Sequence, residues 1–180
     1  MKIAFLTAGG IAPCLSSSIS MLIQEYKKQN IDCEFIGYLY GYKGLLIGQK
    51  ITISQDSDFN ALCDFGGSFL GNSRVKLTNI EDCIHHGYIK RGETPLDVAA
   101  NQLKKDKIDI LHTIGGDDTN STAGDLVKFL SKNNYNLTVI GLPKTIDNDI
   151  YPIDQTLGAY TAAEQTNIFF QNIVNENTTS

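Results

Sequence analysis

The sequence predicts an α/β protein in three layers, a Rossmann-like parallel sheet with helices on both faces. Apolar runs of strand length alternate along the chain with longer segments whose apolar residues recur at helical spacing. Acid-rich loops follow two of the strand-like runs, at residues 115–119 and 143–149. Because ligands bind at the carboxyl ends of parallel strands, we expect both loops to contribute to one site.

The first half of the chain alternates apolar runs with glycine-rich turns. The elements expected there are a strand at 2–7, a helix over about 15–26, strands at 33–38 and 51–53, and loops at 41–48 and 66–74. The pair His85-His86 is expected in an exposed loop, without a chemical role.

The second half continues the same alternation. Thr94 and Pro95 predict a helix start, with Thr94 as the N-cap and Pro95 at the first helical position. The elements expected after that helix are a strand at 108–114, a helix over about 119–131, a strand at 137–142, a helix over about 156–174 and a frayed tail at 175–180. His112 is expected to be a core residue.

Composition excludes several classes of protein. The 180 residues suit a single domain that forms a core without disulfides or a structural metal. A net charge of -5 argues against nucleic acid as a partner. The four cysteines form no CxxC pair, which argues against a zinc site and for a reducing, cytoplasmic location. No stretch reaches the roughly 18 apolar residues of a membrane span.

Two glycine-rich segments are candidates for phosphate binding. Gly9 and Gly10 follow the first predicted strand and precede a helix, where free amides can bind a phosphate, although a plain tight turn has the same pattern. Arg74 ends the loop at 66–74, where its guanidinium can bind a phosphate through two hydrogen bonds or simply face solvent.

The two acid-rich loops are candidates for metal binding and catalysis. Asp117 is placed to hold Mg2+, which prefers one or two carboxylates together with phosphate oxygens. Asp118 and Thr119 can alternatively be N-caps. In the loop 143–149, Lys144 can neutralise a transferring phosphoryl group and Asp147 can accept a proton from an attacking hydroxyl.

Asp149, in the same loop, can bind the metal or orient the loop. An ordinary Asx turn is the alternative for the whole segment 143–149.

Together these motifs resemble the phosphofructokinase family. The shared motifs, in the family's order, are Gly9-Gly10 with Ala12-Pro13, Gly71-Asn72-Ser73-Arg74, Gly115-Gly116-Asp117-Asp118 and the segment 143–149. The segment Gly41-Tyr42-Lys43-Gly44 is similar to the family's loop near the donor phosphates. The match extends over nearly the whole chain.

The resemblance points to the pyrophosphate-dependent branch, because ATP-dependent members usually carry glycine where this chain has Asp118 and Lys144. It implies reversible, Mg2+-dependent transfer of a phosphoryl group from pyrophosphate to the 1-hydroxyl of fructose 6-phosphate, a glycolytic reaction. Ile11 also departs from the acidic residue of many ATP-using members.

The resemblance also implies a role for each matching residue. Pyrophosphate would be bound by Gly10, Arg74 and Lys144, and Mg2+ by Asp117 and Asp149. The sugar-phosphate site would be lined by Thr145, Ile146 and Asp147, of which Asp147 would be the base. Lys144 would also stabilise the transition state, and Asp118 would exclude ATP.

The resemblance implies an incomplete enzyme. The chain stops near the middle of the family's length, so residues 1–180 would be the donor-binding half that carries the catalytic base. This half would be inactive alone. The full-length protein would form a homo-oligomer, a dimer or a tetramer. Two other functions stay open: an ATP-dependent phosphofructokinase, and a non-catalytic phosphate-binding regulatory module.

Overall fold

A computed structural model describes residues 1–179 and contains one five-stranded sheet. The strands are β1 (Lys2–Thr7), β2 (Glu34–Tyr38), β3 (Lys50–Ile53), β4 (Ile110–Gly115) and β5 (Thr138–Pro143). The helices are α1 (Leu15–Lys28), α2 (Tyr42–Ile47), α3 (Phe59–Asp64), α4 (Ile80–His85), α5 (Pro95–Asp106), α6 (Asp117–Lys132) and α7 (Ala159–Thr178).

The strand order is β3-β2-β1-β4-β5, with β1 at the centre. The pairs β1–β2, β1–β4 and β4–β5 are parallel, which confirms the predicted sheet for four strands. The edge strand β3 runs antiparallel to β2. Only the short helix α2 and two turns join these strands, whereas a parallel crossover needs about a dozen residues or more.

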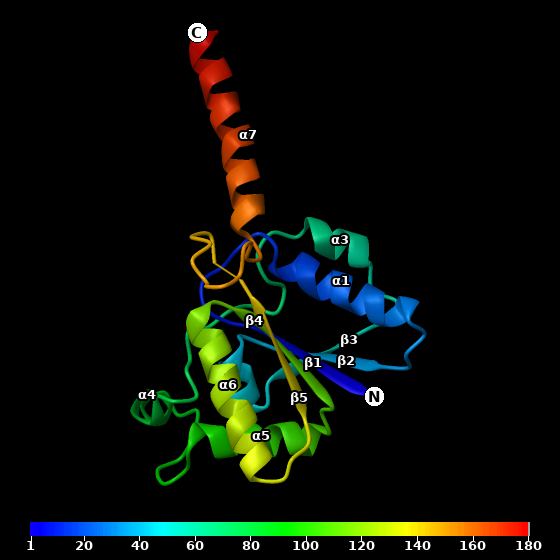
Figure 1. The fold of residues 1–180 in the computed structure, drawn as a ribbon, viewed down its shortest axis with the longest axis vertical. Coiled ribbons are helices and arrows are strands. Elements are labelled where there is room, and N and C mark those ends of the chain that lie inside the picture. The colour runs from blue at the N-terminus through cyan, green and yellow to red at the C-terminus, as the bar shows by residue number, and fades with distance from the viewer. Residues whose placement is uncertain (180) are drawn as a thin grey trace.

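Helices cover both faces of the sheet, which confirms the three-layer prediction (Figure 1). Side chains of β1 alternate between two cores: Ile3 and Phe5 pack towards α1 and α3, and Ala4 and Leu6 pack towards α2, α5 and α6. This explains the unbroken apolar run of β1, because a strand buried on both faces has no polar side.

Three short helices were not expected from the sequence. Residues 42–47, predicted as a loop, form α2, in which Leu45 and Leu46 are buried. Helices α3 and α4 begin at the N-caps Asp58 and Asn79, whose side chains accept backbone N–H bonds. Six-residue helices are too short for a clear helical period. His85 ends α4 rather than lying in a loop, and it is exposed, as is His86.

The start of α5 matches the prediction, and the start of α6 does not. The Thr94 hydroxyl accepts a hydrogen bond from the Asp97 N–H at 3.2 Å, with Pro95 in the first turn. Helix α6 begins at Asp117, two residues before the expected start, and its N-cap is Gly116. The alternative that Asp118 or Thr119 is a plain N-cap is therefore wrong.

The last helix stands away from the rest of the chain (Figure 1). Helix α7 extends to Thr178, so the predicted fraying from residue 175 is wrong up to that point, and Ser180 lies outside the described residues. None of its residues is buried. Within residues 1–179, no helix combines the length and apolar character needed to cross a membrane.

Candidate active site

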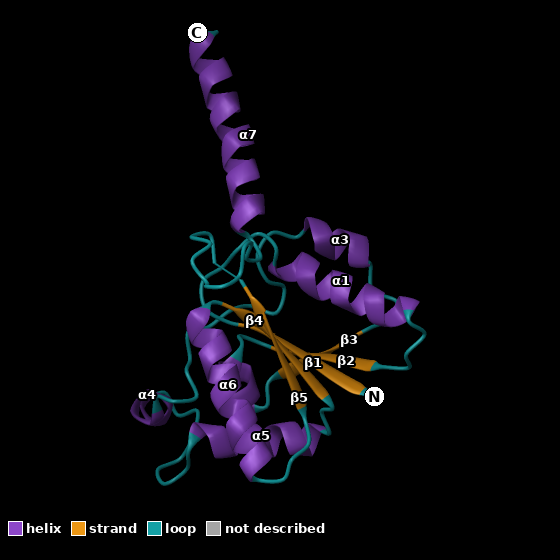
Figure 2. Cartoon of the chain, viewed as in Figure 1, coloured by secondary structure: helices purple, strands orange, loops and turns teal. Residues whose placement is uncertain are grey.

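A cleft of about 870 Å³ lies at the carboxyl edge of the parallel strands. The chain leaves β1 towards β2 on one side and later returns to β4 on the other, so the strand order reverses beside β1. Ligand sites of open α/β sheets form at such switch points. Loops gather at this end of the sheet, next to the start of α7 (Figure 2).

Four separate segments line the cleft. They are the loop after β1 (8–12), the segment 73–76, the loop and first turn after β4 (116–119) and the loop after β5 (144–147), together with Tyr42 of α2. Segments separated by more than a hundred residues in sequence therefore meet at one site.

The loops after β1 and β4 approach each other closely. A Cβ added to Gly115 would lie 2.3 Å from the Thr119 hydroxyl and 2.7 Å from the carbonyl oxygen of Ala8. Only glycine fits at this position without a shift of the backbone.

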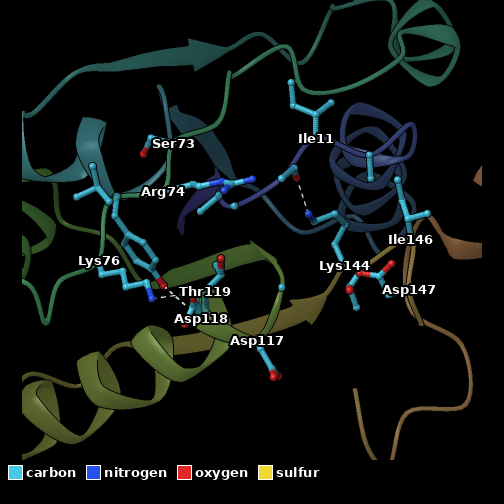
Figure 3. A pocket seen from close by; sticks show the side chains of 18 residues that line it. Ile11, Ser73, Arg74, Lys76, Asp117, Asp118, Thr119, Lys144, Ile146 and Asp147 are labelled. Carbon is cyan, nitrogen blue, oxygen red and sulfur yellow. Dashed lines mark hydrogen bonds and ion pairs between the residues drawn. The ribbon is translucent and has the colours of Figure 1, made fainter. Parts of the chain in front are cut away.

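Lys144 is buried at the bottom of the cleft, with 5% of its surface exposed. Its ammonium donates a hydrogen bond to the carbonyl oxygen of Gly10 (Figure 3). Its backbone N–H donates to the carbonyl of Gly115 at 2.8 Å. Burial holds the pKa of Lys144 below its ordinary value, and the nearby Arg74 guanidinium acts in the same direction. The ammonium has no ion pair within residues 1–179, and such a desolvated cation favours an anionic ligand beside it.

The first turn of α6 brings two carboxylates to the cleft. Asp118 forms an ion pair with Lys76 at 2.8 Å (Figure 3). Asp117 is exposed and has no ion pair within residues 1–179. Both carboxylates lie at the positive end of the helix dipole, which stabilises them.

The loop after β5 has its own internal hydrogen bonds. The Thr145 hydroxyl donates to the Asp149 carboxylate at 2.8 Å, and the Asn148 side-chain oxygen accepts from the Thr156 N–H at 2.8 Å. These bonds hold the segment that presents Asp147, whose exposed side chain lines the cleft.

The structure brings most of the predicted site residues together. Those that line the cleft are Gly10, Arg74, Asp117, Asp118, Lys144, Thr145, Ile146 and Asp147. Asp149 is not among the lining residues and is bonded to Thr145. Within residues 1–179, no group of three or more His, Cys, Asp or Glu side chains is arranged to hold a metal ion.

Sequence reasoning missed other residues of the site. Lys76 was not considered, because it lies two residues beyond Arg74, where the glycine-rich loop at 66–74 ends. Tyr42 was noted only within a motif; its buried hydroxyl donates to the Thr119 carbonyl at 2.9 Å and so fixes the first turn of α6. Asn72 and Asn120 do not line the cleft, but their side chains donate to carbonyl groups of its two glycine loops, and neither was given a role from the sequence.

The fold and the cleft define a doubly wound α/β protein with an open cleft at its switch point. Its sequence matches the model of the Phosphofructokinase family over residues 2–179. The chain belongs to the phosphofructokinase family.

The pyrophosphate–fructose 6-phosphate 1-phosphotransferase of Methylomonas methanica is 58% identical over 98% of this chain. The protein of the same description from Mastigamoeba balamuthi is 54% identical over 98% of the chain. An ATP-dependent 6-phosphofructokinase from Persephonella marina is 36% identical over 89%. The chain spans 44% of the Methylomonas relative's length and 43% of the Mastigamoeba relative's.

Solved structures share the fold. The pyrophosphate-dependent phosphofructokinase of Marinobacter aquaeolei superimposes with a TM-score of 0.72 at 25% identity, over 88% of this chain and 37% of that one. The phosphofructokinase of Saccharomyces cerevisiae gives a TM-score of 0.72 at 25% identity, over 97% of this chain and 24% of that one.

Proposed function

We propose that this chain is the donor-binding half of a pyrophosphate-dependent phosphofructokinase. The reaction is the reversible, Mg2+-dependent transfer of a phosphoryl group from pyrophosphate to the 1-hydroxyl of fructose 6-phosphate. The observation that carries the proposal is the convergence of Asp117, Lys144 and Asp147 from two strand ends on one cleft. The similarity to two relatives of that description supports it.

Lys144 and the glycine loops provide the donor site. The ammonium of Lys144 lies beside the Gly10 backbone, and Arg74 lines the same cleft. In a cleft that is partly closed to water, such fixed donors stabilise charge that develops on a transferring phosphoryl group. Pyrophosphate, small and highly charged, is the donor that these cations favour.

Asp118 discriminates between donors. Its carboxylate lines the cleft, where it forms an exposed ion pair with Lys76. The α-phosphate and ribose of a nucleotide would extend past the first turn of α6, where the negative charge of Asp118 repels them.

Asp147 is the base that accepts the proton of the sugar 1-hydroxyl. It is exposed in the cleft and its carboxylate has no hydrogen bond within residues 1–179, so it is free to accept that proton. Thr145 and Ile146 line the adjoining wall of the sugar-phosphate site.

Asp117 fits a magnesium ion carried by the donor. Mg2+ keeps several waters and binds through one or two carboxylates and substrate phosphates, so a single exposed carboxylate near a diphosphate site suffices. The ion would neutralise charge on the transferring group. Asp149 would act at most through water, since its carboxylate is bonded to Thr145.

The remaining contacts to the sugar phosphate are proposed to come from the part of the full-length enzyme that this chain does not span. The relative from Methylomonas is more than twice as long, because the 178 matched residues of this chain correspond to 44% of its length. Apolar side chains of α7 such as Phe169 and Phe170 are exposed, as expected of a helix that packs against a second half-domain. The full-length enzyme is proposed to be a homo-oligomer.

Calorimetry tests the donor site in this chain. We expect Mg-pyrophosphate to bind, Asp117→Ala to remove the magnesium-dependent part of the affinity, and Asp125→Ala on the same helix to have no effect. Formation of fructose 1,6-bisphosphate by the 180-residue chain should be near background. Robust turnover by this chain would show that it is not merely the donor half. Absence of pyrophosphate binding would overturn the proposed function.

A further inference from the structure

Asn72 is bonded to the glycine loop after β1. Its side-chain amide donates two hydrogen bonds, to the carbonyl oxygens of Gly9 at 3.2 Å and Gly10 at 3.1 Å. Its own side-chain oxygen is buried and has no hydrogen-bond partner within residues 1–179. A buried acceptor without a partner is unfavourable, so this position does not serve stability alone.

Asn120 makes the same arrangement at the glycine loop after β4. Its side-chain amide donates to the carbonyl oxygens of Gly115 at 2.8 Å and Gly116 at 3.0 Å. A Cβ on Gly141 would lie 2.3 Å from the Asn120 side-chain oxygen. Gly141 of the neighbouring strand β5 has no side chain, and this leaves space for Asn120.

Each asparagine fixes the orientation of peptide planes. In a planar trans peptide the carbonyl of one residue and the N–H of the next point in opposite directions. When Asn72 holds the Gly9 carbonyl, the Gly10 N–H points away from Asn72; the same applies to Asn120, Gly115 and the Gly116 N–H. Within residues 1–179 neither glycine N–H donates a hydrogen bond, and both glycines line the cleft.

We propose that Asn72 and Asn120 are positioning residues that hold the Gly10 and Gly116 amides as hydrogen-bond donors for pyrophosphate. The inference rests on the proposed function. The helix after the second loop has no side-chain cap, so its first amides remain free for the same anion. Two loops from neighbouring strands would thus bind one diphosphate from two sides.

Titration of the 15N-labelled chain with Mg-pyrophosphate, followed by amide chemical shifts and calorimetry, tests this. In the wild-type chain the Gly10 and Gly116 amide signals should shift. Asn72→Ala should abolish the Gly10 shift and Asn120→Ala the Gly116 shift. Each should weaken pyrophosphate binding by about tenfold, the loss expected for a hydrogen bond to a charged group.

Asn133→Ala is the matched control. Asn133 lies at the other end of α6 and donates to the Phe129 carbonyl at 2.9 Å, far from the cleft. We expect it to change the melting temperature at most and to leave pyrophosphate affinity unchanged. If Asn72 and Asn120 had a purely structural role, their alanine variants would likewise change the melting temperature at most and keep the pyrophosphate affinity of the wild type.

The outcomes separate the two proposals. Wild-type binding with unchanged affinity and unchanged glycine shifts in both alanine variants would overturn the positioning role and leave the donor site intact. No binding by the wild-type chain would overturn the proposed function and the positioning role together. If an alanine variant does not fold, the uncharged, near-isosteric Asn72→Leu or Asn120→Leu, which lack the N–H donors, must show the loss instead.

Discussion

The ammonium of Lys144 donates a hydrogen bond to the carbonyl oxygen of Gly10, 134 residues earlier in the chain. The bond links the loop after β5 to the loop after β1, across the end of β4. It places a buried positive charge beside a glycine backbone, in a cleft that also contains Arg74. Desolvation of an ammonium that has no ion pair within residues 1–179 opposes folding, and the proposed binding of an anionic donor would account for a lysine at this position.

Replacing Lys144 with methionine should separate binding from stability. Methionine has a similar length and no charge, so we expect Lys144→Met to leave the free energy of unfolding unchanged or raise it. Pyrophosphate affinity should fall by about a hundredfold, the loss of a charge-assisted contact in a desolvated site. Chemical denaturation and calorimetry measure the two quantities. Substitution of the exposed Lys128 of α6 by methionine should change neither quantity. Full affinity in Lys144→Met would exclude Lys144 from the donor site.

Asp118→Gly should change donor preference without a loss of stability. The Lys76–Asp118 ion pair is exposed on both sides, and such pairs contribute about 0–1 kcal/mol. We expect the variant to gain affinity for Mg-ATP relative to Mg-pyrophosphate, and the double variant Asp118→Gly with Lys144→Gly to shift further. Competition binding with both donors is the measurement. An unmodified chain that prefers ATP would show that the donor assignment is wrong.

His112 should make the chain sensitive to mild acid. It lies buried in β4, stacked on Phe5, with one ring nitrogen 3.0 Å from the Tyr26 hydroxyl and the other without a partner within residues 1–179. Burial lowers the pKa of His112 from 6.5 to about 4. The unfolded chain therefore binds more protons between these values.

The resulting stability is fully present above pH 6.5 and decreases as the pH falls to about 4, by up to about 3 kcal/mol. Urea denaturation across this range measures the slope. His112→Phe should flatten it, whereas substitution of the exposed His86 by glutamine should not. A slope unchanged in His112→Phe would assign the acid sensitivity to other groups.

Helix α7 should contribute little to the stability of this chain. Phe169 and Phe170 are 66% and 63% exposed. We therefore expect the double substitution of both by serine to leave the melting temperature unchanged, whereas Phe35→Ala in the core should cost about 3–5 kcal/mol. Calorimetric melting of both variants provides the comparison. A fall of several degrees in the serine variant would mean that α7 packs against the chain in solution.

The sequence alone predicted the bounds of those strands and helices whose apolar residues follow a clear pattern. Strand β1 matches its prediction at both ends, and β4 and β5 lie within two residues of theirs, because each is an apolar run bounded by turns. The short helices α2, α3 and α4 were missed because a turn or two of helix gives no readable period, and α2 also contains Gly44. The antiparallel direction of β3 depends on the length of its connection rather than on its residues.

The candidate site residues could be predicted from their residue type and their position at the ends of strands. The hydrogen bonds that hold the loops of the site could not be predicted from the sequence. Asp117, Lys144 and Asp147 could be grouped because each follows a strand of one parallel sheet. The partners that hold the backbone in place across the cleft, Asn72 and Tyr42, donate to carbonyl groups that lie 62 to 77 residues away in sequence. No pattern of neighbouring residues indicates such contacts.

Because the cleft is built from four segments that are distant in sequence, an anion bound there would stabilise the native state of the chain. An ion that touches the loops after β1, β4 and β5 contacts them together only when the sheet is formed, so it binds the native state alone. At a concentration one hundred times its dissociation constant, such a ligand adds about 2.7 kcal/mol to the free energy of unfolding. The melting temperature of this chain would then report the supply of inorganic pyrophosphate around it.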